Sequence, residues 1–138
     1  MTVVMVAGGF DPLHVGHVEH IRCGKHLFGR VTLVVSVNPD ADLIAKKGFC
    51  FMPLGERMEI IEALRDVDMV IASLPDDGLQ ARTLEYVMPD IYLLGGDKHP
   101  ESMESRERDV CDRYGIRVVY DNAPKIQSSS GLVSGRLF

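Results

Sequence analysis

The sequence has few cysteines, no block of basic residues and no long apolar run. Its three cysteines lie far apart and match neither a zinc-ligand spacing nor a disulfide framework, which is typical of reduced thiols. The net charge is -5, which argues against a nucleic-acid-binding surface. No apolar stretch approaches the roughly 20 residues that cross a bilayer, and the N-terminus does not resemble a secretion signal. We therefore expect a cytoplasmic protein without a membrane or nucleic-acid partner.

What remains is the composition of an ordinary globular domain. The chain has 138 residues, a length that suits one domain with its own core. Hydrophobic residues make up 46% and charged residues 25%, as in most globular proteins. No repeat, linker or low-complexity segment divides the chain. We therefore expect a single domain over residues 1–138.

Segments typical of strands and of helices alternate along the whole chain. Apolar runs, several of them rich in β-branched residues, predict strands over residues 3–7, 31–37, 69–71, 91–94 and 116–120. Helical spacing predicts helices over residues 16–28, 53–65, 79–87, 100–114 and 131–137. Residues 41–53 read as a long loop. This alternation predicts an α/β fold, a Rossmann-like doubly wound five-stranded parallel sheet with helices on both faces.

The turn between the first expected strand and the first expected helix has an unusual sequence. Small residues end the strand at Gly8 and Gly9, and His14 and His17 begin the helix. Free backbone N–H groups and the positive end of the helix dipole converge at such a turn, which favours an anion. Two imidazoles at the same helix end suit a phosphate that gains negative charge during a reaction.

Two other loops with chemically distinctive sequences also follow strand ends. Residues 95–99 follow the fourth expected strand, and residues 124–130 follow the fifth. Ligands of doubly wound sheets bind beyond the carboxyl ends of the strands, at the point where the strand order reverses. We therefore expect all three loops to meet at one ligand site.

Several motifs carry a resemblance to a known family. Residues 8–17, with the sequence GGFDPLHVGH, resemble the signature GxFDxxHxGH of the cytidylyltransferase-like nucleotidyltransferases. That family includes glycerol-3-phosphate and ethanolamine-phosphate cytidylyltransferases and heptose-1-phosphate adenylyltransferases. Further similarity lies in Glu56-Arg57-Met58, residues 64–68, Gly95-Gly96-Asp97 and Ser128-Ser129-Ser130. The resemblance therefore covers almost the whole chain.

The resemblance implies a nucleotidyltransferase, in which a phosphomonoester attacks the α-phosphorus of a nucleoside triphosphate and pyrophosphate leaves. CTP is slightly favoured by analogy with other small stand-alone chains. The turn Gly95-Gly96-Asp97 followed by Pro100-Glu101 is instead more similar to the adenylyltransferases that act on heptose, so ATP stays open. The acceptor is a small polyol, amino-alcohol or sugar phosphate. Mg²⁺ bound mainly through the triphosphate, and a homodimer, are also implied.

The resemblance also implies roles for particular residues. Catalytic candidates are His14, His17 and Lys46. Nucleotide-binding candidates are Gly8, Gly9, Phe10, Asp11, Gly16, Gly95, Asp97, Ser128, Ser129 and Ser130. Candidates for contact with the acceptor or a phosphate are Lys47, Arg57 and Arg136, and no protein metal ligand is expected.

Several of these residues have a second interpretation. Phe10 is the residue most readily explained by packing. Asp11 either orients a catalytic histidine or accepts hydrogen bonds from the amides of its own turn. Arg57 is otherwise an ordinary exposed partner on its helix.

The sequence leaves open two alternatives to a free-standing enzyme. A nucleotide-binding regulatory module would keep the same motifs without catalysing a reaction. A fragment of a class I aminoacyl-tRNA synthetase would share the His-x-Gly-His turn, but the chain has little basic surface for tRNA. Measuring pyrophosphate release separates the enzyme from the module.

Overall fold

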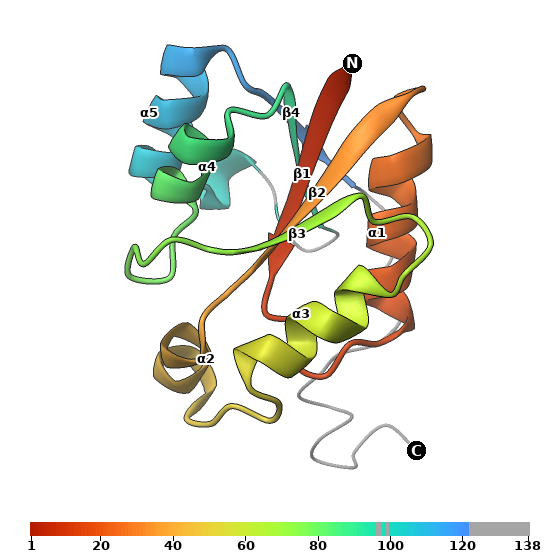
Figure 1. The fold of residues 1–138 in the computed structure, drawn as a ribbon. Coiled ribbons are helices and arrows are strands. Elements are labelled where there is room, and N and C mark those ends of the chain that lie inside the picture. Colours follow the sequence, from red (N-terminus) through yellow and green to blue (C-terminus); the bar gives the residue numbers. More distant parts are fainter. Residues whose placement is uncertain (96–97, 99, 122–138) are drawn as a thin grey trace.

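Five parallel strands form one sheet in the computed structural model, which describes residues 1–95, 98 and 100–121 (Figure 1). The strands are β1 (Thr2–Gly8), β2 (Val31–Val37), β3 (Met69–Ala72), β4 (Ile91–Leu94) and β5 (Arg117–Tyr120). Their order is β3-β2-β1-β4-β5, with parallel pairing throughout. The winding therefore reverses between β1 and β4, where a doubly wound sheet holds its ligands. The expected α/β architecture is confirmed.

Helices cover both faces of the sheet. They are α1 (Val15–His26), α2 (Asp40–Lys47), α3 (Leu54–Glu62), α4 (Ala81–Val87) and α5 (Ser105–Tyr114), with a short 3₁₀ turn, η1 (Pro100–Ser102). Helices α1 and α3 lie on one face, whereas α4 and α5 lie on the other (Figure 1). Helix α2 lies beyond the carboxyl ends of β1 and β2. It is thus the helix placed to approach a ligand at that edge.

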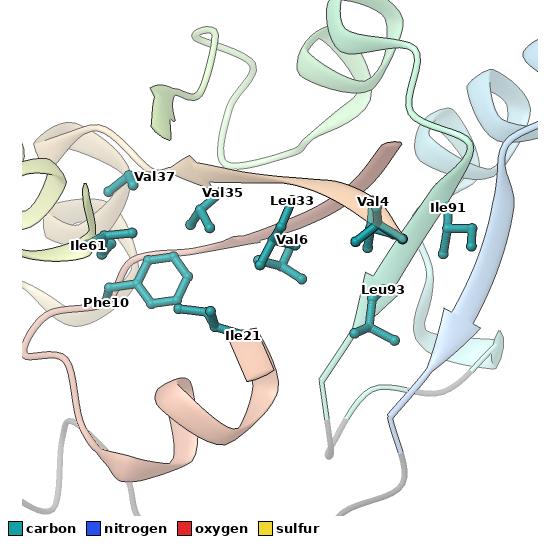
Figure 2. Close-up of a cluster of buried hydrophobic side chains, with 11 residues drawn as sticks. Val4, Val6, Phe10, Ile21, Leu33, Val35, Val37, Ile61, Ile91 and Leu93 are labelled. Carbon is teal, nitrogen blue, oxygen red and sulfur yellow. The ribbon is translucent and has the colours of Figure 1, made fainter. Parts of the chain in front are cut away.

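The alternation of side chains along β1 and β2 divides the core into two layers. Val4 and Val6 pack with Ile21 of α1 and with Ile61 of α3 on one face (Figure 2). Met5, the residue between them, packs on the opposite face with the layer of α4 and α5. Burying a side chain of this size stabilises the fold by about 1.5–3 kcal/mol. The two layers hold the carboxyl ends of the strands in a fixed arrangement.

Leu27 lies just beyond α1, although the helical spacing predicts a helix to residue 28. Its side chain is 63% exposed, whereas Ile21 is buried. The helix ends at His26, and Leu27 is its C-cap. The spacing rule therefore fails at this position because the helix ends there.

The segment expected to be a long loop contains helix α2. Asp40 and Asp42 lie in its first turn and Lys46 and Lys47 in its last, which complements the helix dipole. Gly48 ends the helix with a left-handed φ of 87°. These are local signals, so the loop prediction was wrong for a reason that the sequence already contained.

Other boundaries shift by a few residues. Helix α3 ends at Glu62, and the predicted helix over residues 100–114 is divided into η1 and α5. Helix α4 begins at Ala81, after a turn in which the carboxylate of Asp76 accepts a hydrogen bond from the amide of Arg82 at 3.1 Å. The predicted helix over residues 131–137 lies outside the described residues.

Candidate active site

His14 and His17 are fixed by reciprocal hydrogen bonds at the start of α1. The side chain of His14 caps the helix, because its Nδ1 accepts a hydrogen bond from the amide of Gly16 at 3.0 Å. The Nδ1 atom of His17 accepts a hydrogen bond from the amide of His14 at 3.2 Å. A neutral imidazole that accepts at Nδ1 carries its proton on Nε2. In the neutral form, each ring therefore carries its proton on Nε2.

The two imidazoles stack on each other. Their centroids are 3.8 Å apart with an angle of 23° between the planes. Phe10 packs edge-on against His17 at 5.0 Å and is otherwise part of the buried core. Phe10 therefore supports the His17 ring by packing. This is the arrangement expected of a pair of preorganised donors.

The carboxylate of Asp11 supports a different loop from its own. It is buried and accepts hydrogen bonds from the amides of Phe51 and Met52 at 2.6 and 2.7 Å. The sequence left open a contact with a histidine or with the amides of its own turn. The structure shows that Asp11 instead joins the turn of His14 to the segment between α2 and α3.

Arg57 is in the interior, although the sequence suggests a contact with acceptor or phosphate. Only 1% of the residue is exposed. Its guanidinium donates hydrogen bonds to the carbonyls of Gly9, Asn38 and Met52 and to the carboxylate of Asp40. These bonds connect the ends of β1 and β2 to the starts of α2 and α3.

The two lysines of α2 lie at different places. Lys46 lines a cavity at the carboxyl edge of the sheet. The ammonium group of Lys47 donates a hydrogen bond to the carbonyl of Asp11 at 3.1 Å and lies 5.6 Å from the centre of the Phe49 ring. Lys47 therefore contacts the turn that carries the histidines.

The cavity has a volume of about 850 Å³ and opens beside the ends of β1 and β4. The sequence had singled out four of its lining residues, Gly8, Gly9, Lys46 and Gly95. Polar lining residues that it had not singled out are Asn38, Asp42, Asp77, Gln80, Lys98, Ser102, Glu104 and Glu107. Asn38 was detectable in principle because it follows a buried strand at the carboxyl edge. Lys98 lies in a loop that the sequence places at the site, and Asp42 lies on the same helix as Lys46. The others lie near α4 and α5, and no local pattern links them to the site.

A network of hydrogen bonds fixes one wall of the cavity. The side-chain amide of Gln80 donates to Oδ1 of Asn38 at 3.0 Å, and its backbone amide donates to the carboxylate of Glu107 at 2.7 Å. The buried hydroxyls of Ser36 and Ser73 donate to Oε1 of Gln80 at 3.1 and 3.3 Å. The wall is therefore polar and held in one arrangement.

Burial also acts on the carboxylates of this wall. It raises the pKa of Glu107, although the amide of Gln80 and the ammonium of Lys98 oppose the shift. Burial raises the pKa of Asp42 as well, and the charges of Asp77 and Asp76 add to that effect. Carboxylates and amides of this kind can accept hydrogen bonds from ligand hydroxyls.

His20 connects the ends of β4 and β5 to α1. Its Nδ1 lies 3.3 Å from the carboxylate of Asp121, and a Cβ atom at Gly95 would lie 3.8 Å from the ring. Burial lowers the pKa of His20, and Asp121 opposes this shift. His20 is one helical turn beyond His17 and was not singled out from the sequence.

Five candidate residues, Asp97, Ser128, Ser129, Ser130 and Arg136, lie outside the described residues. Within the described part of the chain, no group of three or more His, Cys, Asp or Glu side chains is arranged to hold a metal ion. Among the same residues, no helix is long and apolar enough to cross a membrane.

Comparison with known proteins shows which family the chain belongs to. The cytidylyltransferase-like family matches residues 5–133, which is most of the chain. The chain belongs to the cytidylyltransferase-like family. The expected family is thus confirmed.

Individual members of the family are similar over much of this chain. Bifunctional protein HldE of Halorhodospira halophila is 38% identical over 119 residues, which cover 85% of this chain. Bifunctional protein HldE of Nitrosococcus oceani is 40% identical over 103 residues, or 73% of this chain. The chain spans 24% and 21% of the lengths of these two relatives.

Solved structures show the same architecture. The lipopolysaccharide core biosynthesis protein from Thermoplasma volcanium is 29% identical, with a TM-score of 0.72, over 92% of this chain and 99% of that one. A protein from Archaeoglobus fulgidus with 18% identity has a TM-score of 0.63 and is similar in fold alone.

Proposed function

We propose that this member of the cytidylyltransferase-like family transfers a nucleotidyl group from a nucleoside triphosphate to a small phosphomonoester. The observation that carries the proposal is the pair of His14 and His17. Their Nδ1 atoms are occupied by backbone amides, and the rings stack at 3.8 Å. Their neutral forms carry a proton on Nε2, and the two rings lie at the start of a helix, where negative charge is favoured.

In this reaction an oxygen of the acceptor phosphate attacks the α-phosphorus, and the bond to pyrophosphate breaks. Negative charge grows on the α-phosphate and on the leaving oxygen. The two imidazoles donate hydrogen bonds to these oxygens, and Lys46 supplies a positive charge from the cavity edge. Loss of one preorganised donor of this kind costs about 3–4 kcal/mol of barrier. Mg²⁺ would be held by the phosphates and by water and would neutralise part of the triphosphate charge.

We further propose ATP as the donor and a sugar phosphate as the acceptor, ahead of CTP. The support is the resemblance of residues 95–101 to heptose-phosphate adenylyltransferases, together with the similarity to proteins named HldE. The similar structure from Thermoplasma volcanium is titled as a lipopolysaccharide core biosynthesis protein. The oxygens of Asn38, Asp42 and Glu107 in the cavity suit the hydroxyl groups of a sugar.

A coupled assay of pyrophosphate release tests the proposal. The purified protein is mixed with Mg²⁺, with ATP or CTP, and with a panel of sugar, polyol and amino-alcohol phosphates. We expect turnover with ATP and a sugar phosphate. Thermal-shift titrations with each nucleotide accompany the assay, because a ligand at 100 times its dissociation constant stabilises a protein by about 2.7 kcal/mol. Tight nucleotide binding without turnover of any pair would instead support the regulatory module.

A further inference from the structure

We propose that Arg57 is a positioning residue that locks α2, with Lys46 and Lys47, against the turn of His14 and His17. This inference rests on the proposed function, because it concerns the geometry of that reaction. It differs from the role that the sequence suggests for Arg57, which is direct contact with a substrate. The evidence is the set of segments that its guanidinium joins.

Arg57 donates to four acceptors from separate segments. Its Nε donates to the carbonyl of Met52 at 2.8 Å. One terminal nitrogen donates to the carbonyls of Gly9 at 2.9 Å and of Asn38 at 2.7 Å, and the other donates to Asp40 at 2.6 Å. Gly9 follows β1, Asn38 follows β2, and Asp40 begins α2. One side chain therefore sets the spacing between the two central strands and the helix that carries the lysines.

A second set of bonds joins the histidine turn to residues 47–52. The carboxylate of Asp11, two residues beyond Gly9, accepts from the amides of Phe51 and Met52. The ammonium group of Lys47 also donates to the carbonyl of Asp11. The histidine turn is thus joined to the C-terminal end of α2 and to the segment that follows it. We call the bonds of Arg57 and Asp11 the loop clamp.

Stability alone gives little reason for a buried charge at this position. Burying a guanidinium carries a large desolvation cost, and well-packed apolar residues often replace buried ion pairs without loss. The planar guanidinium does offer five donors in a fixed arrangement, which lysine cannot imitate. Geometry is therefore the property that the loop clamp supplies to the site. A shift of about 1 Å in a catalytic group can cost about a hundredfold in rate.

Asp40 is the best place to loosen the clamp without opening a cavity. Its side chain is 44% exposed, whereas that of Arg57 is fully buried. Burial raises the pKa of Asp40, but the hydrogen bonds from Arg57 and Cys50 outweigh this effect and hold the pKa below its usual value. Replacing Asp40 removes one bond of the clamp and the contact with the Cys50 thiol, and it deletes no side chain from the apolar core.

The test compares Asp40→Ala with Glu56→Ala. Both residues are acidic and lie in the first turn of a helix, but no contact of the clamp involves the Glu56 side chain. We expect Asp40→Ala to lower kcat about tenfold or more, because small shifts of the catalytic groups are costly in rate. The KM for both substrates should be nearly unchanged. Hydrogen exchange of the amides of residues 49–52 should become faster, because the amides of Phe51 and Met52 belong to the clamp. Glu56→Ala should match the wild type in all three measurements.

Arg57→Lys provides the second variant. It keeps the charge but cannot donate to all four acceptors, so we expect a loss of kcat at least as large as in Asp40→Ala. A rise in KM for one substrate with an unchanged kcat would instead show direct contact with that substrate and overturn the proposal. If Arg57→Lys does not fold, Asp40→Ala decides the question.

The two proposals can fail separately. If the wild type turns over no pair of substrates, the proposed function fails, and hydrogen exchange alone tests whether the clamp orders residues 49–52. If the wild type is active but Asp40→Ala keeps both its kcat and its exchange rate, the positioning role of Arg57 is overturned.

Discussion

The backbone amide of His14 donates a hydrogen bond to Nδ1 of His17 at 3.2 Å, while the two rings stack at 3.8 Å. Each histidine therefore fixes the other through both backbone and side chain. This relationship determines which nitrogen carries the proton and where it points. It also makes the pair sensitive to a change at either residue.

His17→Ala should abolish measurable turnover and leave the fold intact. The substitution removes one donor to the phosphates, which costs about 3–4 kcal/mol of barrier or a hundredfold or more in rate. It also leaves the amide of His14 without its acceptor, at a cost of about 1 kcal/mol in stability. Pyrophosphate release and a thermal melt measure the two effects. His26→Ala, at an exposed histidine on the same helix, is the control, and near-normal kinetics in His17→Ala would remove the catalytic assignment.

Gly9→Ala should lower activity by displacing α2. A Cβ atom at Gly9 would lie 2.6 Å from a terminal carbon of Leu43, which is a buried residue of that helix. Leu43 must move, and Lys46 on the same helix moves with it. Overpacking of this kind typically costs about 1–3 kcal/mol in stability.

The double variant Gly9→Ala with Leu43→Ala checks this explanation. Removing the Leu43 side chain leaves room for the new methyl group, so the two changes should not add. We expect the double variant to be closer in stability to Leu43→Ala alone than an additive sum would give, as measured by urea unfolding. Strict additivity would show that Gly9 acts in another way.

Asp68 should contribute stability at neutral pH that is lost in acid. Its carboxylate accepts from the amide of Leu33 at 2.7 Å and from the ammonium of Lys25 at 2.6 Å. Burial raises the pKa of Asp68, but these two bonds lower it by a larger amount. The pKa of Asp68 in the folded protein therefore lies below the ordinary value of 3.8. A carboxylate with a lowered pKa stabilises the fold at pH values above its pKa in the unfolded chain. That contribution disappears as the pH falls through its pKa in the folded protein.

Asp68→Asn should therefore reduce the free energy of unfolding by about 1 kcal/mol at pH 7, a value that allows for solvent screening. The difference from the wild type should shrink as the pH falls below about 4. Urea unfolding at pH 7 and pH 3 measures both values, with the exposed Asp109→Asn as a control. An equal difference at the two pH values would contradict the assignment.

Cys111 should resist thiol reagents in the folded protein. It is 2% exposed, and burial together with Glu107 raises its pKa to about 11. Few thiolates form at pH 8 under these conditions, and the thiolate is the reactive form. Mass spectrometry after labelling with iodoacetamide should find Cys111 unmodified in buffer and modified in urea. Rapid labelling without denaturant would show that α5 opens from the sheet.

Local patterns were sufficient for much of the fold. Residues 31–37 form an interior strand, because a nearly continuous apolar run rich in β-branched residues is typical of a strand buried on both faces. The helix after His14 follows from a capping side chain and from its neighbours in sequence. Helix α2 also has local signals in Asp40, Lys47 and Gly48, although the length of the segment suggests a loop.

The roles of Asp11 and Arg57 required the tertiary structure. The partners of Asp11 are about 40 residues further along the chain, at Phe51 and Met52. Arg57 follows a motif that suggests contact with a ligand, and its position on α3 does not reveal that β1 and β2 both end beside it. Long-range partners of this kind depend on how strands and helices pack, which spacing along one element does not encode.

The sequence by itself determined the family and the place of the histidine turn, because a strand end, two imidazoles and a helix start are close in the chain. Only the tertiary structure decided how that turn is held. The bonds from Arg57 and Asp11 join segments that meet only after the sheet has formed. The chemistry is therefore local in sequence, whereas its geometry depends on the packing of the whole sheet edge.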